Sequence, residues 1–382
     1  MQTITLTTFL AAGTALAVAG SAATAADSGA LPRVYIVPLD GQLGTDIHPM
    51  ALDEVIADAK AAKPDLIIFR LNSTDKDNND YLQNDDRSEM SMFDDDQARR
   101  MIKSLKEGLR EFPQVCWVQD CVGFGFILAF AWPDMYVSNG GRLWGPTYEQ
   151  IARRQQHPDQ EVQRKFREAM NAITGGFIQA GGYDGYMAEC LLRPEKVCSV
   201  DFTGRDGLVW RDDTKGMYVL DSNDKDLLRF SADTAEEIGL ADGMVSSDPD
   251  EGLKDLLFLR GVREFETIDS GTAIVTGYIE DWRKEFEKAQ EFLKDAQQPE
   301  SGDALKEITR QRGLYDKVLK IIERYEAVQR RLGINPVELK SRIGQLDEQR
   351  KQLQKQKKDG SGSGGSGGSR GGRGFGKGLG GG

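Results

Sequence analysis

The sequence predicts an α/β fold with a mainly parallel sheet, followed by a helical C-terminal extension. Short apolar runs alternate with amphipathic runs of helical spacing through most of the chain. Strand, helix and strand in this order require right-handed crossovers, which produce parallel pairing. From Tyr278 onward the composition becomes charged and helical. With 382 residues, of which 39% are hydrophobic, the chain can bury one domain core and carry extensions.

The first half of the chain contains four expected strands and the helices that connect them. The strands are short apolar runs at 33–39, 65–71, 115–118 and 135–137. Apolar residues at helical spacing predict helices over Pro49–Ala62 and Asp94–Arg110, and the second begins with aspartates that favour the positive end of a helix dipole. A short apolar helix is expected over Gly123–Ala131.

The second half of the predicted domain is less regular. A helix is expected over Gln160–Ala180, where a pair of glycines gives a stop signal. The stretch 197–229 has the composition of short strands and turns. The stretch 231–245 predicts a helix capped by Thr234, then a turn and a strand.

The C-terminal part predicts long helices and an unstructured tail. Apolar residues from Leu314 to Leu332 alternate three- and four-residue steps, which is a coiled-coil-like seam. A helical hairpin packed on its own chain is as compatible with this short seam as an oligomer is. Asn335-Pro336 predicts the start of another helix. Residues 360–382 are rich in Gly and Ser and bury too little surface to fold, so we favour a flexible tail over an RNA-binding segment.

The N-terminus predicts export. Phe9–Ala23 is an almost unbroken run of small and apolar residues, and Ala23-Thr24-Ala25 has the spacing that a signal peptidase accepts. The segment before it has no Lys or Arg, and an uncleaved leader is the alternative. We expect residues 1–26 to be a signal peptide and the mature chain to be periplasmic or secreted. No later stretch reaches the ~18 apolar residues of a membrane span, so no transmembrane helix is expected in the mature chain.

Charge and cysteine content narrow the partners further. The net charge of −12 and pI near 4.9 argue against nucleic acid as a partner. The chain has four cysteines, which in an oxidising compartment could form two disulfides. Cys190 and Cys198 are the favoured pair, since the segment between them can fold back across Pro194. Cys116 lies in an apolar strand and is expected to be a buried thiol. No cluster of His and Cys is present in the sequence, so we expect no metal and no cofactor.

Three segments in a fixed order carry a family resemblance. They are RVYIVPLDGQLG with the following helix and DLIIFRLNST, then VCWVQDCVGFGFILAFAWPDMYVSNGGRLWG, then FSADTAEEIGLADGMV. Together they resemble the ClpP/crotonase superfamily, most closely the signal-peptide-peptidase A and NfeD-type membrane-bound serine peptidases. The resemblance implies a ClpP/crotonase-like domain of repeated β-β-α units over residues 31–262. The charged helical pattern and the glycine-rich composition beyond it predict a helical hairpin or coiled-coil extension over 275–358 and a disordered tail over 359–382. Rings or stacked trimers in the superfamily imply a homo-oligomer.

The family's nucleophile is missing from its place. In the family, a serine lies about ten residues before the aspartate that opens the next strand, here Asp134. Counting back from Asp134 gives Phe124, or Gly123 if one residue is inserted. Neither side chain can attack a carbonyl. Cys121 is the nearest candidate, two or three positions early, and a structural role for it is the alternative.

The oxyanion turn also departs from the family pattern. Family members follow the second strand with a Pro-Gly-Gly turn whose N–H groups hold the oxyanion. Here the strand is followed by Asn72, Ser73 and Thr74, with no glycine. The segment KFREAMNA is similar to the one that carries the family's catalytic lysine, and it places Lys165 in the position of the general base. Lys165 is therefore a relic of the dyad or an exposed structural lysine.

Two other patterns have weaker chemical meaning. Residues 75–86 carry acidic side chains at alternating positions, but they lack the sixth-position glycine of a calcium loop, so a solvated loop is preferred. His48 and His157 are the only histidines, and we expect both to be surface or turn residues. The sequence therefore offers few histidines from which a Ser-His-Asp triad could be built.

The resemblance, together with the missing serine and the missing glycine turn, favours a catalytically degenerate protein that binds peptides or unfolded protein segments in the cell envelope. The alternative is an active periplasmic serine or cysteine endopeptidase that uses Cys121, Ser73 or Ser138. An acyl-CoA enzyme of the crotonase type is disfavoured, because CoA esters are cytoplasmic and the missing glycines would weaken its oxyanion hole.

Overall fold

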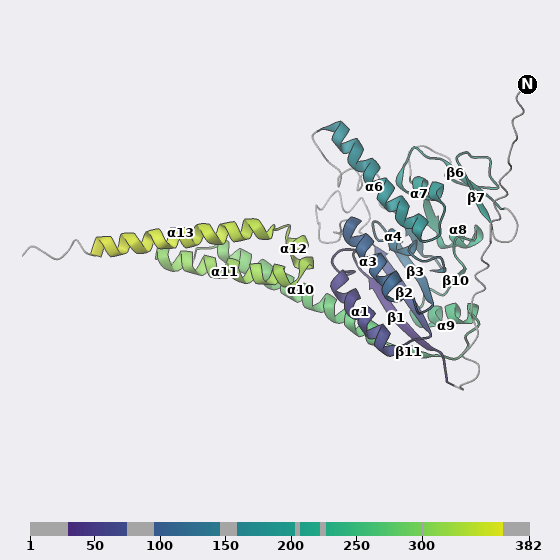
Figure 1. Ribbon diagram of the computed structural model, residues 1–382, viewed down its shortest axis with the longest axis horizontal. Helices are drawn as coiled ribbons and strands as arrows, with labels where there is room; N and C mark the ends of the chain where they lie inside the picture. Colours follow the sequence, from purple (N-terminus) through teal and green to yellow (C-terminus); the bar gives the residue numbers. More distant parts are fainter. Residues whose placement is uncertain are drawn as a thin grey trace, which may run out of the picture.

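The structure is a computed structural model that describes residues 30–74, 95–145, 159–202, 207–221, 227–299 and 302–361. It consists of an α/β body and a helical stalk that projects from one side of the body (Figure 1). The body contains a mainly parallel sheet flanked by helices, as the sequence predicts.

The central sheet has the strand order β10-β4-β3-β2-β1-β11, and every pairing along this path is parallel. In chain order these strands are β1 (Arg33–Asp40), β2 (Leu66–Thr74), β3 (Gln114–Val122), β4 (Met135–Ser138), β10 (Gly243–Val245) and β11 (Glu266–Ile268). Near its end β3 pairs with β5 (Arg142–Trp144), and β5 pairs antiparallel with β9 (Arg229–Ser231). The carboxyl ends of β2 and β3 therefore lie side by side.

Helices cover both faces of the sheet, which explains why the central strands are apolar on both sides. One face packs under α1 (Pro49–Ala62) and α3 (Asp95–Gly108), where Tyr35, Val37 and Phe69 join the largest core. The alternate residues of β1 and β2, such as Ile36 and Ile68, point to the other face and pack with α9 (Pro249–Leu259). The strand period of two thus assigns neighbouring residues to different cores.

The turn from β3 into α4 differs from the prediction of a helix over Gly123–Ala131. The helix α4 covers only Phe126–Ala129. Strand β3 continues to Val122 because Cys121 and Val122 pair with β5, and Gly123 then turns the chain with a φ of 99°. The strand is therefore longer, and the helix shorter, than the local apolar pattern predicts.

The middle of the chain adds two helices and a small sheet. Helix α6 (Gln160–Ala180) has the predicted bounds, and α7 (Gly185–Leu192) follows it. The small antiparallel sheet has the order β7-β6-β8, with β6 at Cys198–Phe202, β7 at Leu208–Arg211 and β8 at Tyr218–Asp221. Helix α8 (Ala232–Glu237) is capped by Ser231, whose hydroxyl accepts the Thr234 N–H, so the predicted cap at Thr234 is wrong.

The stalk is built from helices that pack on their own chain. Helix α10 (Ser270–Gln297) starts against β1 and α1 and runs outward, α11 (Ala304–Arg324) returns, α12 (Glu326–Leu332) lies near the body, and α13 (Pro336–Ser361) runs outward again (Figure 1). Val318, Ile321 and Trp282 are buried among these helices. The predicted seam is interrupted at Tyr325, between α11 and α12.

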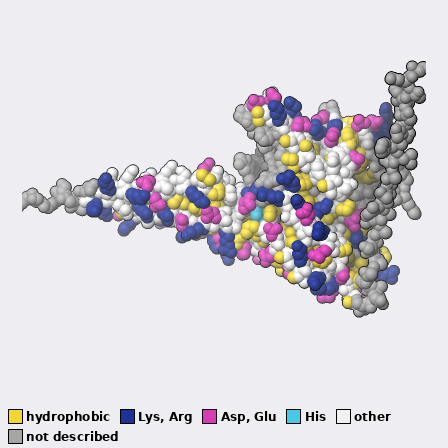
Figure 2. Space-filling model, in the orientation of Figure 1, with side chains coloured by type: hydrophobic (Ala, Val, Ile, Leu, Met, Phe, Trp, Pro, Cys, Tyr) yellow, Lys and Arg dark blue, Asp and Glu magenta, His cyan; other side chains and the backbone are white. Residues whose placement is uncertain are grey.

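The surface of the stalk carries many Lys and Arg side chains, interspersed with acidic ones (Figure 2). Within the part of the chain that the structure describes, no helix has both the length and the apolar character that a membrane crossing requires.

Candidate functional site

The carboxyl ends of β2 and β3 form the candidate site, because parallel α/β sheets bind ligands beyond these ends. The strand register places Ser73 beside Cys121 and Asn72 beside Asp120, after a bulge between Leu71 and Asn72. The turn with Gly123 follows at once. The structure therefore brings the predicted oxyanion segment and the predicted nucleophile segment together at one edge of the sheet.

Gly123 and Phe124 are both buried and serve the turn. The Gly123 N–H donates to the carbonyl of Trp144 at 3.0 Å, and its own carbonyl accepts the Phe126 N–H at 3.3 Å. The side chain of Phe124 is 8% exposed and belongs to the main core. These two positions therefore hold the strand-to-helix turn and the core, and neither offers a hydroxyl or a thiol.

Ser73 fills the space between the two segments. Its side chain is fully buried, and its hydroxyl has no hydrogen-bond partner among the residues described. A Cβ at Gly125 would stand 2.3 Å from the Ser73 Oγ and 3.7 Å from the Cys121 Sγ. Ser73 and Cys121 therefore both face Gly125, and no side chain fits at position 125 while Ser73 is present.

Lys165 lies on the first turns of α6 and faces solvent. Its side chain is 67% exposed, and its Nζ is 2.9 Å from the Oε1 of Glu161 one turn earlier. A lysine becomes a general base when burial destabilises its charged form. A solvent-exposed ion pair provides no such burial.

Ser138, another candidate nucleophile, is engaged in the core at the end of β4. Its hydroxyl accepts the indole N–H of Trp117 at 2.9 Å and lies 3.5 Å from the carbonyl of Ser246. Cys116 is fully buried on β3, and desolvation raises the pKa of its thiol well above the ordinary value. Both groups therefore have a structural role in this conformation.

A polar and aromatic rim that the sequence did not reveal borders this site. Arg142 on β5 forms a two-pronged ion pair with Asp120, with Nε–Oδ1 and Nη2–Oδ2 distances of 3.0 and 2.6 Å. The guanidinium carbons of Arg142 and Arg229 each lie 5.3 Å from the ring centre of Trp144. The alternation of Arg142 and Trp144 around the apolar Leu143 could have indicated two residues of this rim. Arg229 could not be indicated in this way, because it comes from a distant strand.

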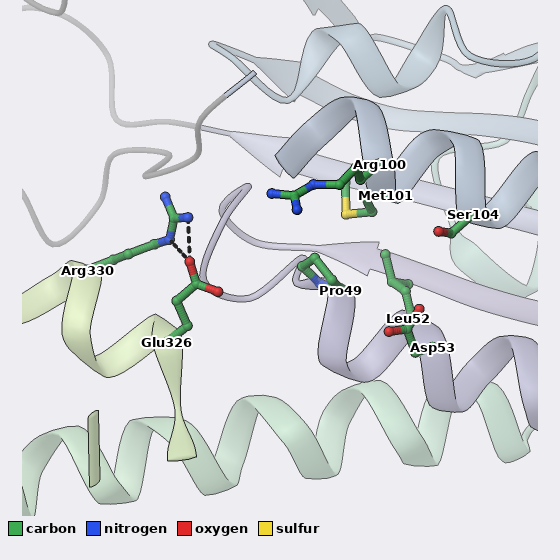
Figure 3. A pocket seen from close by; sticks show the side chains of 8 residues that line it. All are labelled: Pro49, Leu52, Asp53, Arg100, Met101, Ser104, Glu326 and Arg330. Atoms are coloured by element: carbon green, nitrogen blue, oxygen red, sulfur yellow. Dashed lines mark hydrogen bonds and ion pairs between the residues drawn. The ribbon is translucent and has the colours of Figure 1, made fainter. Parts of the chain in front are cut away.

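A cavity of about 340 Å³ opens beyond the carboxyl end of β1, between α1, α3 and α12 (Figure 3). Arg100 and Arg330 lie on opposite sides of it, and the Nη2 of Arg330 is 2.6 Å from Glu326. The full lining is Pro49, Leu52, Asp53, Arg100, Met101, Ser104, Glu326 and Arg330. The sequence could not indicate this cavity, because α12 joins it from the far end of the chain.

His48 follows the turn at 44–46, as one half of the prediction had it, but it is buried at the junction of body and stalk, so the predicted surface position is wrong. Its Nδ1 accepts the Met50 N–H at 3.2 Å and caps α1, and its Nε2 lies 3.6 Å from Glu326. Its ring stacks on Tyr278 at 5.6 Å. Burial lowers the pKa of His48 to about 4, against an opposing effect of Glu326. The imidazole is thus a neutral structural group.

Some predicted features lie outside the described residues. They are the leader at 1–26, the acidic stretch 75–86, His157 and the tail beyond 361. Cys190 and Cys198 are described, and they are neighbouring buried thiols on α7 and β6.

The fold and this edge define the chain as an α/β protein with a parallel sheet and a tight strand-to-helix turn at the site. No protein-family model matches the sequence, and no curated protein matches it. Among solved structures, the chain is similar to a lysine-to-alanine mutant of a membrane-bound stomatin-specific protease in complex with a substrate peptide, with a TM-score of 0.36 and 14% identity over 59% of this chain and 80% of that one.

Two further solved structures are similar at the same level of identity. A peptidase from Plasmodium falciparum has a TM-score of 0.32 and 14% identity, covering 55% of this chain and 95% of that one. A probable enoyl-CoA hydratase/isomerase from Mycobacterium abscessus has a TM-score of 0.28 and 14% identity, covering 69% and 93%. At these scores the likenesses carry no argument about activity.

Proposed function

We propose that this chain is an exported, catalytically degenerate member of the ClpP/crotonase superfamily that holds a peptide or an unfolded protein segment without cleaving it. It acts in the cell envelope as a homo-oligomer. The three sequence segments that resemble the signal-peptide-peptidase A and NfeD-type peptidases support the family, and the apolar N-terminal run supports export.

The contact between Ser73 and Gly125 carries the proposal. Acyl transfer needs an open position about 3 Å from both a nucleophile and the oxyanion donors. Here the fully buried Ser73 side chain occupies the space against Gly125, where the two catalytic segments meet. A substrate carbonyl cannot enter that space without displacing Ser73.

Two further observations support the loss of catalysis. The backbone N–H of Gly123 is already bonded to Trp144, so it cannot bind a developing oxyanion. Lys165, the proposed relic base, is paired with Glu161 in solvent. The serine is thus missing from its expected position, and the oxyanion donor and the base are engaged in other contacts.

The rim beside the blocked site supplies a surface for an extended segment. Strand β9 is paired with β5 on one edge, and within the described strands its other edge has no partner. An added strand there would gain main-chain hydrogen bonds. Trp144, with Arg142 and Arg229 each 5.3 Å from its ring centre, places an aromatic side chain and positive charge beside that edge. We therefore place the bound segment along β9, with an apolar or acidic side chain near Trp144.

Catalysis is tested with the purified chain lacking residues 1–26, a fluorophosphonate probe and casein as an unfolded substrate. We expect no covalent labelling and no cleavage. Labelling or cleavage that disappears in Ser73→Ala or Cys121→Ala would establish the endopeptidase alternative and overturn the proposal. Loss of cleavage in Ser138→Ala would likewise establish the alternative, whereas cleavage that persists in all three variants and in Lys165→Ala would indicate a contaminating protease, which further purification would remove.

Binding is tested with fluorescein-labelled reduced casein and anisotropy. We expect saturable binding that weakens by about tenfold or more in Trp144→Ala, because aromatic anchors dominate such surfaces. Tyr218→Ala on the small sheet is the control, since Tyr218 is an exposed aromatic residue of β8, which pairs with β6 and not with β9, and the change should leave binding unaltered. Equal loss in both variants, or no binding at all, would contradict the placement along β9.

A further inference from the structure

A second cavity, of about 720 Å³, lies between the start of α7, the small sheet and the turn after α8. Its lining includes Pro133 and Asp242, which stand just before the first residues of β4 and β10. Because the central strands are parallel, this cavity is at the amino ends of the sheet, whereas the candidate site is at the carboxyl ends of β2 and β3. The small sheet is on the side of the body away from the stalk (Figure 1). The cavity is therefore separate from the sites described above.

The side chains that line this cavity are apolar or aromatic, apart from two aspartates. Ile238 and Leu240 are buried, and Tyr183, Phe202 and Trp210 are half-buried. Sites for small molecules are typically about 300–1,000 Å³ in volume, with apolar and aromatic walls and a few polar groups. The size and the side chains of this cavity therefore fit a small organic molecule better than a length of polypeptide.

The aromatic walls are held in place by contacts behind them. The Tyr183 hydroxyl donates to the carbonyl of Trp132 at 2.9 Å, and the Tyr183 ring meets Phe130 edge to face at 5.1 Å. The Trp210 ring meets Phe230 of β9 in the same manner at 6.3 Å. Walls that are fixed before a ligand arrives lose less conformational entropy when it binds.

The two aspartates each present an unused acceptor. The Oδ1 of Asp184 accepts the Tyr186 N–H at 2.7 Å, and the Oδ2 of Asp242 accepts the Met135 N–H at 2.8 Å. Among the residues that the structure describes, the other oxygen of each carboxylate has no hydrogen-bond partner. Both side chains are exposed, so a ligand in the cavity can reach them.

The charge of Asp242 is only partly compensated. Partial desolvation raises the pKa of Asp242, and the negative charge of Asp134 adds to this effect. The N–H of Met135 and the charge of Arg260 oppose it, but Arg260 is itself paired with Asp134 at 2.9 Å. A cation bound beside Asp242 would stabilise its charged form.

The backbone of the cavity offers few donors for an anion. Several lining N–H groups donate to carbonyls within the fold, namely those of Gly182, Tyr183, Leu240, Ala241 and Asp242. A ligand therefore meets acceptors and negative charge. Nowhere in the described part of the chain are three or more His, Cys, Asp or Glu side chains placed to hold a metal ion, which favours an organic cation at these two carboxylates.

We propose that this cavity binds a small organic cation, an ammonium or guanidinium group carried on an aromatic or aliphatic body. The charged group lies at the free oxygens of Asp184 and Asp242 and donates hydrogen bonds to them. The apolar body lies against Tyr183 and Trp210, where an adjacent cation is also attracted to the ring faces. The bound molecule contacts α7, the small sheet and the turn after α8, so it stabilises the folded chain.

The charge requirement is tested by calorimetric titration of the chain lacking residues 1–26 with three probes that share one phenyl ring. They are phenethylammonium, the neutral 2-phenylethanol and the anionic 3-phenylpropionate. We expect saturable binding of the ammonium, at least about tenfold weaker binding of the alcohol and no binding of the carboxylate. Equal binding of all three, or no binding of the ammonium below about 10 mM, would overturn the proposal.

The site is tested with Asp184→Asn and Asp242→Asn, which remove the charge but retain the oxygen that accepts the Tyr186 or Met135 N–H. Each variant should weaken phenethylammonium binding by about tenfold and abolish the rise in melting temperature that the ligand produces in the wild type. Asp53→Asn on α1 is the matched control, since it removes an exposed carboxylate far along the chain, and it should bind as the wild type does. Unchanged affinity in the double variant, with Asp184→Asn and Asp242→Asn together, would place the ligand elsewhere and contradict the assignment.

A last arm separates a free amine from a protein side chain. Nα-acetyl-lysine amide carries the same ammonium group on a peptide unit, and we expect it to bind more weakly than phenethylammonium because its backbone amides find few donors in the cavity. Tighter binding of the lysine derivative would mean that the cavity receives a polypeptide side chain and would contradict a small-molecule site.

Discussion

Two junctions of this molecule are built in opposite ways. At the carboxyl edge of β2 and β3, Ser73 and Gly125 are packed so closely that no side chain atom fits between them. At the junction of body and stalk, ionisable groups meet: Asp46 with Arg283, and His48 with Glu326. The edge at β2 and β3 is thus filled by a packed side chain, while the joint to the stalk is built on pairs of ionisable groups.

The difference indicates that ionisable groups are held in a fixed geometry at the junction of body and stalk, and not at the edge of β2 and β3. A catalytic site requires ionisable groups with shifted pKa values in an accessible cleft. Here the histidine with the lowered pKa caps α1 and stacks on Tyr278 of α10. The group that could titrate near neutrality in another protein therefore holds the stalk to the body. Four predictions test this contrast.

The largest effect is expected at the filled junction. In Gly125→Ala, the new Cβ would stand 2.3 Å from the Ser73 Oγ and 2.8 Å from its Cβ. Overpacking of this kind costs about 2–3 kcal/mol of unfolding free energy, measured by urea denaturation. Gly277→Ala in α10 is the control, because nothing lies within 4 Å of its Cβ position, and it should gain up to about 1 kcal/mol.

The same clash predicts a rescue. Ser73→Gly removes both atoms that the new methyl group at position 125 would meet. The double variant, with Ser73→Gly and Gly125→Ala together, should therefore recover most of the loss in a double-mutant cycle. A cycle with no coupling between the two positions would show that the segments are separated in solution and that the site is open.

The next effect is expected at the charged junction. Asp46 is 3% exposed, accepts the Gln42 N–H at 3.0 Å and pairs with Arg283 at 2.9 Å. In Asp46→Ala both groups lose their acceptor, and we expect a loss of about 2 kcal/mol because Arg283 is itself partly solvated. The control Asp53→Ala removes an exposed carboxylate of α1 and should change stability by less than about 0.5 kcal/mol. Equal effects would mean that the junction is hydrated.

The third prediction concerns pH. The folded-state pKa of His48 is about 4, below its ordinary value of 6.5, so the unfolded chain binds the proton more readily. The stabilisation from neutral His48 is complete above pH 6.5 and is lost as the pH falls toward 4. Glu326 faces the imidazole and opposes this shift, while Arg330 supports it.

The measurement compares urea unfolding at about pH 7 and about pH 4.5 in the wild type and in His48→Asn, on either side of most of this titration. Asn retains the helix cap but does not titrate. The pH dependence should be shallower in the variant, and the remaining slope belongs to the carboxylates. Identical slopes would show that His48 is hydrated and that the junction opens.

The smallest effect is expected at Lys165. Its pair with Glu161 is more than half exposed at both ends, and such pairs contribute about 0.5 kcal/mol or less. Lys165→Ala should therefore leave stability and casein binding within error of the wild type. A loss of binding or of a measurable hydrolytic activity would give Lys165 the role that its solvent exposure argues against.

Much of the fold could be predicted because local pattern and tertiary structure agree. The helix over Pro49–Ala62 and the helix over Gln160–Ala180 have the predicted bounds, and the buried strands have the continuous apolar runs of a covered parallel sheet. Disagreement occurred where pairing with a distant strand decided the outcome. The pairing of β3 with β5 extended the strand to Val122 and shortened α4.

The candidate site could be predicted only in part. The positions of Gly123 and Ser73 followed from counting along the family pattern, and the register of β2 and β3 brings them to one edge. The rim with Trp144 and Arg229 could not be found, because antiparallel pairing of β5 with β9 joins residues far apart in the sequence. The burial of His48 was missed for the same reason, since Tyr278 and Glu326 come from the stalk.

Helix α10 connects the stalk mechanically to the central sheet. Its first turn is fixed to the body, where the Ser270 hydroxyl and the Tyr35 hydroxyl both donate to Asp58, and only Asp269 separates it from β11. The same unbroken helix of 28 residues, about 42 Å long, becomes the first helix of the stalk. A pull or twist applied to the stalk would therefore reach β1 directly. Because the helix is continuous, its first turn sets the direction in which the stalk leaves the body.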